Sequence, residues 1–225
     1  MTQNVLSDGH WLAISTATDV EAAALFDVRA GQATLRLERR ERWRRGQPRR
    51  CLAHLEALLA EAPGEPVAGI LVEVGPGSFT GVRLGLAVAR ALAYADGITA
   101  LGVDSFALAR AAAGDTSAAV LLAARPRHVY LDLPGAPVEE LPITEAVARL
   151  QQAPHRTVAA EASVLLACAI DADRALPVEL PALSAMPALA ARSPRAAEPI
   201  YVGVSEAERT HGIVLPDSTL PVTRH

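Results

Sequence analysis

The segment Gly75-Pro76-Gly77-Ser78-Phe79-Thr80-Gly81-Val82-Arg83 is where a buried strand turns directly into a long helix. Residues 67–74 before it are a short run, mostly apolar and partly β-branched, which is typical of a buried strand. The glycines and the proline predict a tight turn, and Ser78 or Thr80 is a suitable N-cap for a helix that continues to residues 96–97. Free N–H groups at a helix start can bind a phosphate or carboxylate, so the loop is either an anion site or only a sharp turn.

The helix after this loop has small side chains at every fourth position along one face: Gly81, Gly85, Ala89 and Ala93. Its opposite side is also apolar, with Val82, Leu84, Leu86, Val88 and Leu92. An interior glycine destabilises a helix by about 1 kcal/mol relative to alanine, so two of them indicate close approach of another element. Either both faces pack within the fold, or the helix belongs to a flat apolar subunit interface.

A second helix is predicted upstream, over residues 49–62. Its apolar residues recur at helical spacing, and it ends before Pro63-Gly64. In the interface interpretation, the two helices meet a partner through Cys51, Leu52, Leu55, Leu58, Leu59, Gly81, Val82, Gly85, Leu86, Ala89 and Ala93.

The remaining patterns predict an α/β protein with mixed sheets flanked by helices. Residues 11–15, 21–28 and 32–39 predict a three-stranded antiparallel meander. Along the rest of the chain, predicted strands and helices follow one another. The strands are expected over 98–103, 118–123, 128–133 and 157–160, and the helices over 106–113, 144–152, 162–170 and 188–192. A length of 225 residues suits two lobes, which we expect at residues 1–103 and 104–225, the latter with a loose tail.

Composition excludes several classes of protein. Hydrophobic residues make up 51% of the chain and charged ones 20%, so the protein is neither disordered nor fibrous. The chain has no lysine, which excludes a P-loop; it has no G-x-S-x-G elbow and no histidines at metal-ligand spacing. Cys51 and Cys168 stand alone in apolar stretches and are expected to be buried thiols. We therefore predict no metal and no cofactor.

The N-terminus and the hydropathy pattern predict a cytoplasmic protein. The first residues have no basic region and no long apolar run, which argues against a secretory signal. Apolar stretches also stay shorter than the 18 residues that a membrane-spanning helix needs, so we expect no membrane association.

Basic charge is concentrated in residues 39–50, which contain seven arginines and one glutamate in a chain of net charge −4. Such a run is usually a solvated face, but it is also a candidate RNA contact through Arg44, Arg45, Arg49 and Arg50, with Trp43 available to stack on a base. The segment leads into the first of the two apolar helices. We interpret it as the rim of a protein–protein surface.

Residues 75–83, running on into a helix of small side chains, resemble the signature of the TsaB family, small bacterial proteins of threonylcarbamoyladenosine biosynthesis on tRNA. Three further segments occur in family order: residues 12–18, 124–130 (Ala-Arg-Pro-Arg-His-Val-Tyr) and 198–202 (Glu-Pro-Ile-Tyr-Val). The resemblance covers most of residues 11–203 and is strongest over 72–105.

The resemblance implies a two-lobed actin-like ATPase or sugar-kinase (ASKHA, RNase H-like) fold. It also implies a non-catalytic scaffold subunit, related to the threonylcarbamoyl-transferring subunit TsaD, that pairs with TsaD through the two N-lobe helices. With TsaE, the complex modifies the adenosine next to the anticodon. We therefore expect an accessory subunit without its own enzymatic activity, either a monomer or a homodimer when alone, and contact with tRNA through the complex.

Three positions depart from the family pattern. Ser15 and Ala123 stand where two strand-end aspartates would be, and Gly203 stands where a late arginine would be. Serine and alanine cannot supply the charge that holds a metal–nucleotide complex in kinase-like relatives. The alternative function, an ASKHA-type phosphotransferase or a peptidase-like enzyme, is weakened by these departures.

Overall fold

The computed structural model describes residues 6–43, 50–61, 66–153 and 156–202. The chain divides into two compact units, each with its own sheet. The first unit comprises residues 1–116 and 179–199, and the second comprises 117–178 and 200–225. The first unit thus extends beyond the lobe expected at residues 1–103 and includes a segment from late in the chain.

The sheet of the first unit begins with the predicted antiparallel meander, formed by β1 (Gly9–Ser15), β2 (Val20–Arg29) and β3 (Gln32–Arg42). Strands β4 (Val67–Glu73) and β5 (Thr99–Val103) continue the sheet parallel to β1. The strand order is β3-β2-β1-β4-β5, so β1 lies at the centre and its carboxyl end lies beside those of β4 and β5. This mixed sheet confirms the predicted fold class.

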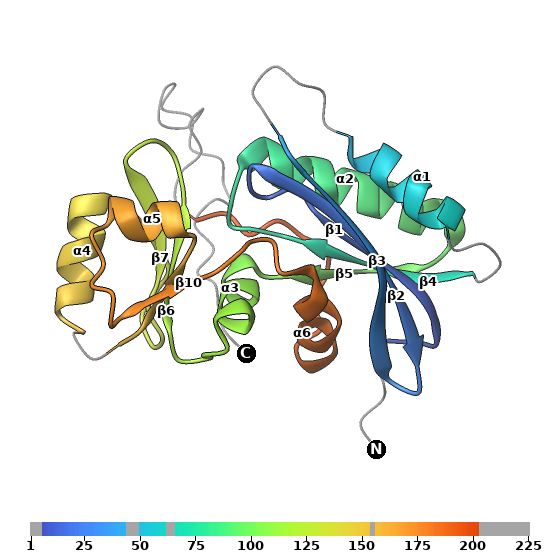
Figure 1. The fold of residues 1–225 in the computed structure, drawn as a ribbon. Helices are drawn as coiled ribbons and strands as arrows, with labels where there is room; N and C mark the ends of the chain where they lie inside the picture. The colour runs from blue at the N-terminus through green and yellow to red at the C-terminus, as the bar shows by residue number, and fades with distance from the viewer. Residues whose placement is uncertain (1–5, 44–49, 62–65, 154–155, 203–225) are drawn as a thin grey trace. The chain divides into compact units, whose positions relative to one another are not determined.

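Helices cover both faces of this sheet (Figure 1). The helices α1 (Cys51–Glu61) and α2 (Phe79–Asp96) lie on one face. The other face packs against α3 (Ser105–Ala113), the short 3-10 helix η1 (Leu183–Ala185) and α6 (Met186–Arg192). Both α1 and α2 were predicted from helical spacing, and both are present.

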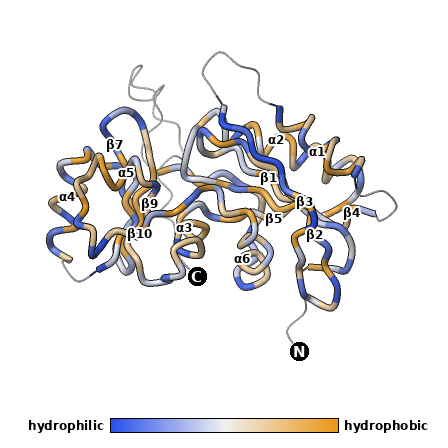
Figure 2. Tube along the Cα trace, in the orientation of Figure 1, coloured by the Kyte–Doolittle hydropathy of each residue, from blue (hydrophilic) through white to orange (hydrophobic). Residues whose placement is uncertain are grey.

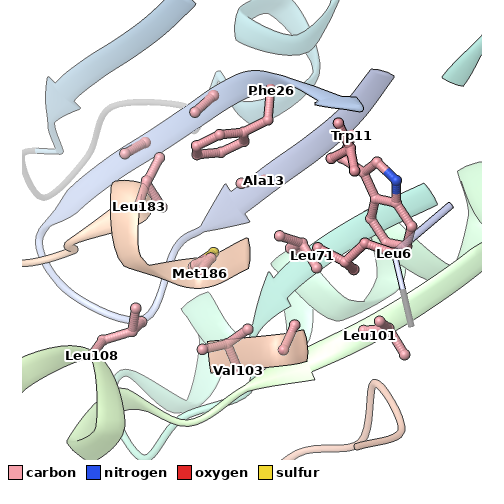
Figure 3. Close-up of a cluster of buried hydrophobic side chains, with 14 residues drawn as sticks. Leu6, Trp11, Ala13, Phe26, Leu71, Leu101, Val103, Leu108, Leu183 and Met186 are labelled. Atoms are coloured by element: carbon pink, nitrogen blue, oxygen red, sulfur yellow. The ribbon is translucent and has the colours of Figure 1, made fainter. Parts of the chain in front are cut away.

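The core beneath α3 and α6 is built from large side chains of the strands (Figure 3). Trp11, Phe26 and Leu71 are fully buried there, with Leu183 and Met186 packed against them from the covering helices. Alternate side chains of each strand point to opposite faces of the sheet, so the residues between these core positions face α1 and α2.

The two edges of the sheet are protected in different ways. Strand β3 is the hydrophilic strand of the sheet (Figure 2), and its charged side chains oppose pairing with another strand. The β5 edge is covered by residues 195–197: the N–H of Gly102 donates to the carbonyl of Arg195 at 2.9 Å, and Leu101 forms an antiparallel bridge with Ala196.

The second unit contains a smaller sheet of order β10-β9-β6-β7-β8. Its elements are β6 (Ala119–Ala123), β7 (His128–Asp132), β8 (Glu139–Pro142), α4 (Ile143–Gln151), β9 (Val158–Ala160), α5 (Ala162–Ala167) and β10 (Ala175–Pro177). The strands β8 and β10 were not predicted, because four and three residues are too few for a period-2 pattern. No helix in the described ranges is both long and apolar enough to cross a membrane.

Candidate partner surface and signature loop

The loop between β4 and α2 is held against the turn that follows β1. The N–H of Ser78 donates to the carbonyl of Ala17 at 2.7 Å, and the Ser78 hydroxyl accepts from the N–H of Gly81 at 3.2 Å. Gly77 lies so close to Ala17 that a Cβ there would overlap the Ala17 carbonyl oxygen. Ser78 is therefore the N-cap, as predicted. Since these two amides already have partners inside the chain, the geometry favours a packed turn over an anion site.

A buried carboxylate lies beneath this loop, at the carboxyl ends of β1 and β4. Glu73 is 2% exposed and accepts hydrogen bonds from the hydroxyls of Ser15 and Ser105, the latter at 2.5 Å. The N–H of Ser105 donates in turn to the carbonyl of Gly75 at 2.9 Å. One carboxylate thus joins the end of β1, the end of β4 and the start of α3.

Sequence reasoning missed Glu73, because the run 67–74 was interpreted as an apolar strand. The signal was present as a single acidic residue at the end of that run, next to a small polar residue at the end of the first strand. The contact joins residues 58 positions apart, so the pairing itself depends on the fold.

The small side chains of α2 make room for the chain's own sheet. The Thr16 hydroxyl donates to the carbonyl of Gly81 at 2.6 Å. A Cβ on Gly85 would lie 2.6 Å from the same hydroxyl oxygen and within 4 Å of Val72 and Ile14. The glycines are therefore explained by close packing of α2 on β1 and β4, the first of the two explanations considered above.

Most of the residues predicted to form the partner interface are buried inside the chain. Nine of them pack within the first unit: Cys51, Leu55, Leu58, Gly81, Val82, Gly85, Leu86, Ala89 and Ala93. Only Leu52 and Leu59 are exposed, at 54% and 37%. The helical pattern predicted both helices, but a helix that is apolar on two sides does not reveal which side faces its own sheet.

The exposed side of these helices carries apolar side chains among charged ones, which are Glu56, Glu61, Arg83, Arg90 and Asp96. We call the part defined by Leu52, Ala53, Glu56 and Leu59 of α1 with Leu84, Ala87, Ala91 and Tyr94 of α2 the outer face; Leu84 is half-buried there, and Val88 beside it is buried. Between the two helices the outer face is hollowed into a groove of about 410 Å³, lined by Arg50, Cys51, Leu52, Ala53, Glu56, Leu84 and Val88. Tyr94 is 92% exposed, an unusual degree for an aromatic side chain.

The two arginines of α2 are exposed on the same side of the helix as Ala87 and Tyr94, and each contacts another group of the chain. Arg83 lies over the ring of Phe79, with 3.8 Å between the guanidinium carbon and the ring centroid. The Nε of Arg90 donates to the carbonyl of Ala197 at 2.8 Å. The lining of the groove contains two charged residues, Arg50 and Glu56, and is otherwise apolar.

The described arginines of residues 39–50 are paired with acidic side chains. Arg39 contacts Glu61, Arg40 contacts Glu38, Arg42 contacts Asp19, and Arg50 lies 4.0 Å from Glu41. Exposed pairs of this kind contribute little stability, but they reduce the local positive charge. Arg44, Arg45 and Arg49 lie outside the described residues, so the predicted RNA contact stays a prediction.

The structure describes two of the three positions that depart from the family pattern. Ser15 is buried against Glu73, Ala123 is exposed at the end of β6, and Gly203 lies outside the described residues. Among the residues that the structure describes, no three His, Cys, Asp or Glu side chains are grouped to hold a metal ion. Cys51 and Cys168 are both buried, and burial raises the pKa of the Cys168 thiol.

Comparison with known proteins supports the resemblance found in the sequence. Residues 48–140 match the family model described as TsaD, tRNA N6-adenosine threonylcarbamoyltransferase. This segment includes α1, the signature loop and α2. No curated protein sequence matches the chain.

Two solved structures from Pseudomonas aeruginosa have the same fold. One is YeaZ, which is TsaB; it is 29% identical, with a TM-score of 0.65, and the match covers 86% of this chain and 99% of YeaZ. The other, described as an uncharacterized protein with similarity to peptidase YEAZ, is 24% identical over 86% of this chain and 99% of that one, with a TM-score of 0.60. The predicted resemblance to TsaB and the ASKHA-type fold class are thereby confirmed.

Proposed function

We propose that this chain is a non-catalytic subunit of the machinery that forms threonylcarbamoyladenosine on tRNA, and that it pairs with TsaD through the outer face of α1 and α2. The likeness to YeaZ and the TsaD-family segment support a role related to tRNA modification. The pairing and the scaffold role are the further steps that we propose. In the full assembly the chain would work in the cytoplasm with TsaE and meet tRNA through the complex.

One observation carries the proposal: the outer face is an apolar, grooved surface on the part of the chain that matches the TsaD family model. Exposed Leu52 and Tyr94 accompany the exposed alanines Ala53, Ala87 and Ala91, with the charged side chains of Glu56, Arg83 and Arg90 around them. Protein interfaces typically have an apolar centre and a polar rim, with aromatic residues enriched at the centre. A helix pair from TsaD is the occupant that we propose. When TsaD is absent, a second copy of the chain could cover the same face.

The absence of an independent reaction is proposed from the strand ends. The Glu73 carboxylate is engaged by Ser15 and Ser105, and the amides of Ser78 and Gly81 are engaged by the chain itself. This packing favours a structural role for the loop. Calorimetry with Mg-ATP on the isolated chain tests the alternative, since micromolar, magnesium-dependent binding would favour a phosphotransferase.

The pairing is tested by measuring the affinity of the chain for TsaD from the same organism. We expect Leu52→Asp and Ala91→Arg each to weaken binding by about a hundredfold, because each places a charge in the apolar centre of the interface, where loss of a central contact commonly costs 2 kcal/mol or more. Leu166→Asp is the matched control. Leu166 is 83% exposed on α5 and lies outside the outer face, so binding should be unchanged.

The same three variants should also be assayed for threonylcarbamoyladenosine formation in a reconstituted system. Formation should fall with Leu52→Asp and Ala91→Arg and persist with Leu166→Asp. Wild-type chain that shows no binding to TsaD would overturn the proposal. Binding that all three variants leave intact would move the interface away from the outer face.

A further inference from the structure

The contacts around Glu73 extend through the sheet to α2. Ser15 is the last residue of β1 and Thr16 follows it directly, and the hydroxyls of the two residues bind groups on opposite faces of the sheet. The Ser15 hydroxyl donates to Glu73 on the face covered by α3, and the Thr16 hydroxyl donates to the Gly81 carbonyl on the face covered by α2. The position of one hydroxyl therefore constrains the position of the other.

Thr16 in turn determines how α2 lies on the sheet. Its hydroxyl fills the notch created by Gly85 and holds the carbonyl of Gly81 at 2.6 Å, so it contacts two successive turns of the helix. Ala17, the next residue, accepts from the N–H of Ser78 and holds the loop before the helix. A shift of the β1 end would accordingly rotate or slide α2 and displace the outer face that α2 carries.

We infer that Glu73 is a positioning residue for partner binding. Its carboxylate holds Ser15 in place, and through the neighbouring Thr16 it determines the position of α2 on the sheet. This inference rests on the proposed pairing with TsaD and adds the group that orients the paired surface. Glu73 and Ser15 are 2% and 0% exposed, so Glu73 acts on the partner only through the helix. The other carboxylate oxygen of Glu73 accepts from Ser105, the first residue of α3, and does not contact Ser15.

The two hydroxyls on Glu73 supply a matched pair of variants. Ser15→Ala and Ser105→Ala each remove one hydroxyl from the same carboxylate. We expect Ser15→Ala to weaken TsaD binding by about tenfold, the equivalent of one buried hydrogen bond left unsatisfied. Ser105→Ala should stay within about threefold of wild type, because it leaves the connection to Thr16 intact. A role of Glu73 in stability alone would make the two variants equal.

A double-mutant cycle tests whether Glu73 acts through Ser15. Glu73→Met should weaken binding by about tenfold, and the double variant with Ser15→Ala should lose no more than either single variant. Glu73→Gln, which keeps the shape and one acceptor, should recover binding to within about threefold of wild type. Additive losses, or a Ser15→Ala variant that is folded and binds like wild type, would overturn the inference. If Glu73→Met fails to fold, the difference in TsaD affinity between Ser15→Ala and Ser105→Ala still tests the inference.

A measurement on the free chain separates failure of this inference from failure of the proposed pairing with TsaD. If wild-type chain does not bind TsaD, amide hydrogen exchange of the free chain still tests the seat of α2. Ser15→Ala should speed exchange over residues 78–86 more than Ser105→Ala does. Equal exchange in the two variants would overturn the inference even where pairing with TsaD is established.

Discussion

The two units of the chain share one topology and differ in the helices that cover their sheets. In the first unit the strand order is β3-β2-β1-β4-β5, and in the second it is β8-β7-β6-β9-β10, with the same alternation of antiparallel and parallel neighbours. Helices α1 and α2 occupy the places in the chain order that α4 and α5 occupy in the second unit. The first unit is therefore an enlarged version of the same arrangement.

The enlargement is greatest in α2 and in the strands β2 and β3. Helix α2 has 18 residues and α5 has 6; β2 and β3 have 10 and 11, and their counterparts β7 and β8 have 5 and 4. Helix α2 is also capped by Ser78 and seated by Thr16, and α5 has no side-chain cap at Glu161. Two units with one topology thus differ in their helices, and the partner surface that we propose lies on the longer ones.

The largest expected effect on the free energy of unfolding comes from removing one buried side chain from the core of either unit. Leu71→Ala in the first unit and Leu121→Ala in the second should each lower the free energy of unfolding by about 3 kcal/mol, because each removes a fully buried side chain and leaves a cavity. Chemical denaturation gives the loss, and hydrogen exchange shows where protection is lost. We expect each variant to affect the unit that contains it, since the two clusters are separate. Equal loss of protection in both units from either variant would show that they unfold together.

A smaller effect is expected from filling the notch under α2. Gly85→Leu should lower the free energy of unfolding by about 2–3 kcal/mol, because the new side chain would overlap the Thr16 hydroxyl and displace the helix. Ala91→Leu, on the exposed side of the same helix, should change it by less than about 0.5 kcal/mol. Thermal melting of both variants provides the comparison. A stable Gly85→Leu variant would mean that α2 is not closely seated.

Removing the cap should cost less again. Ser78→Ala should lower the free energy of unfolding by about 1 kcal/mol, since the N–H of Gly81 loses the acceptor that Ser78 provides. Ser163→Ala, on the exposed side of α5, serves as the control and should change it by less than about 0.5 kcal/mol. Urea titration of both variants measures the difference. Similar losses of stability from Ser78→Ala and Ser163→Ala would contradict the difference in capping between α2 and α5.

The smallest effect concerns the buried thiol of the second unit. Because burial raises the pKa of Cys168 above its ordinary value of 9.0, the folded chain keeps this thiol protonated where the unfolded chain ionises it. The unfolded state therefore binds fewer protons, and stability contributed at this site falls as pH rises above 9.0, with no change below it.

Alkylation followed by mass spectrometry checks this state of the thiol. We expect slow labelling of Cys168 in the native chain, accelerated by Leu121→Ala, which weakens the core around it. Cys168→Ala should remove the contribution of this thiol to the fall in unfolding free energy at alkaline pH. Fast labelling of the native thiol near neutral pH would contradict its burial.

Local patterns in the sequence were sufficient for most elements. The turn 75–78, the Ser78 cap and α2 follow from glycine, proline and a hydroxyl at fixed offsets, all within one short segment. The meander β1–β3 and the helix α1 follow from periodicity in the same way. Sequence alone therefore determined the α/β class, the signature loop and the pair of helices that the resemblance to TsaB emphasises.

Only the tertiary structure decided which residues face outward and which polar groups meet. Both sides of α2 are apolar, so periodicity could not distinguish the seat formed by Gly81 and Gly85 from the outer face with Leu84 and Tyr94. Glu73 reaches Ser15 across 58 positions, and Arg39 meets Glu61 across 22, and neither pairing has a local signature. Caps and turns depend on neighbours in the chain, whereas burial and ion pairing depend on neighbours in space, which strand order and register supply.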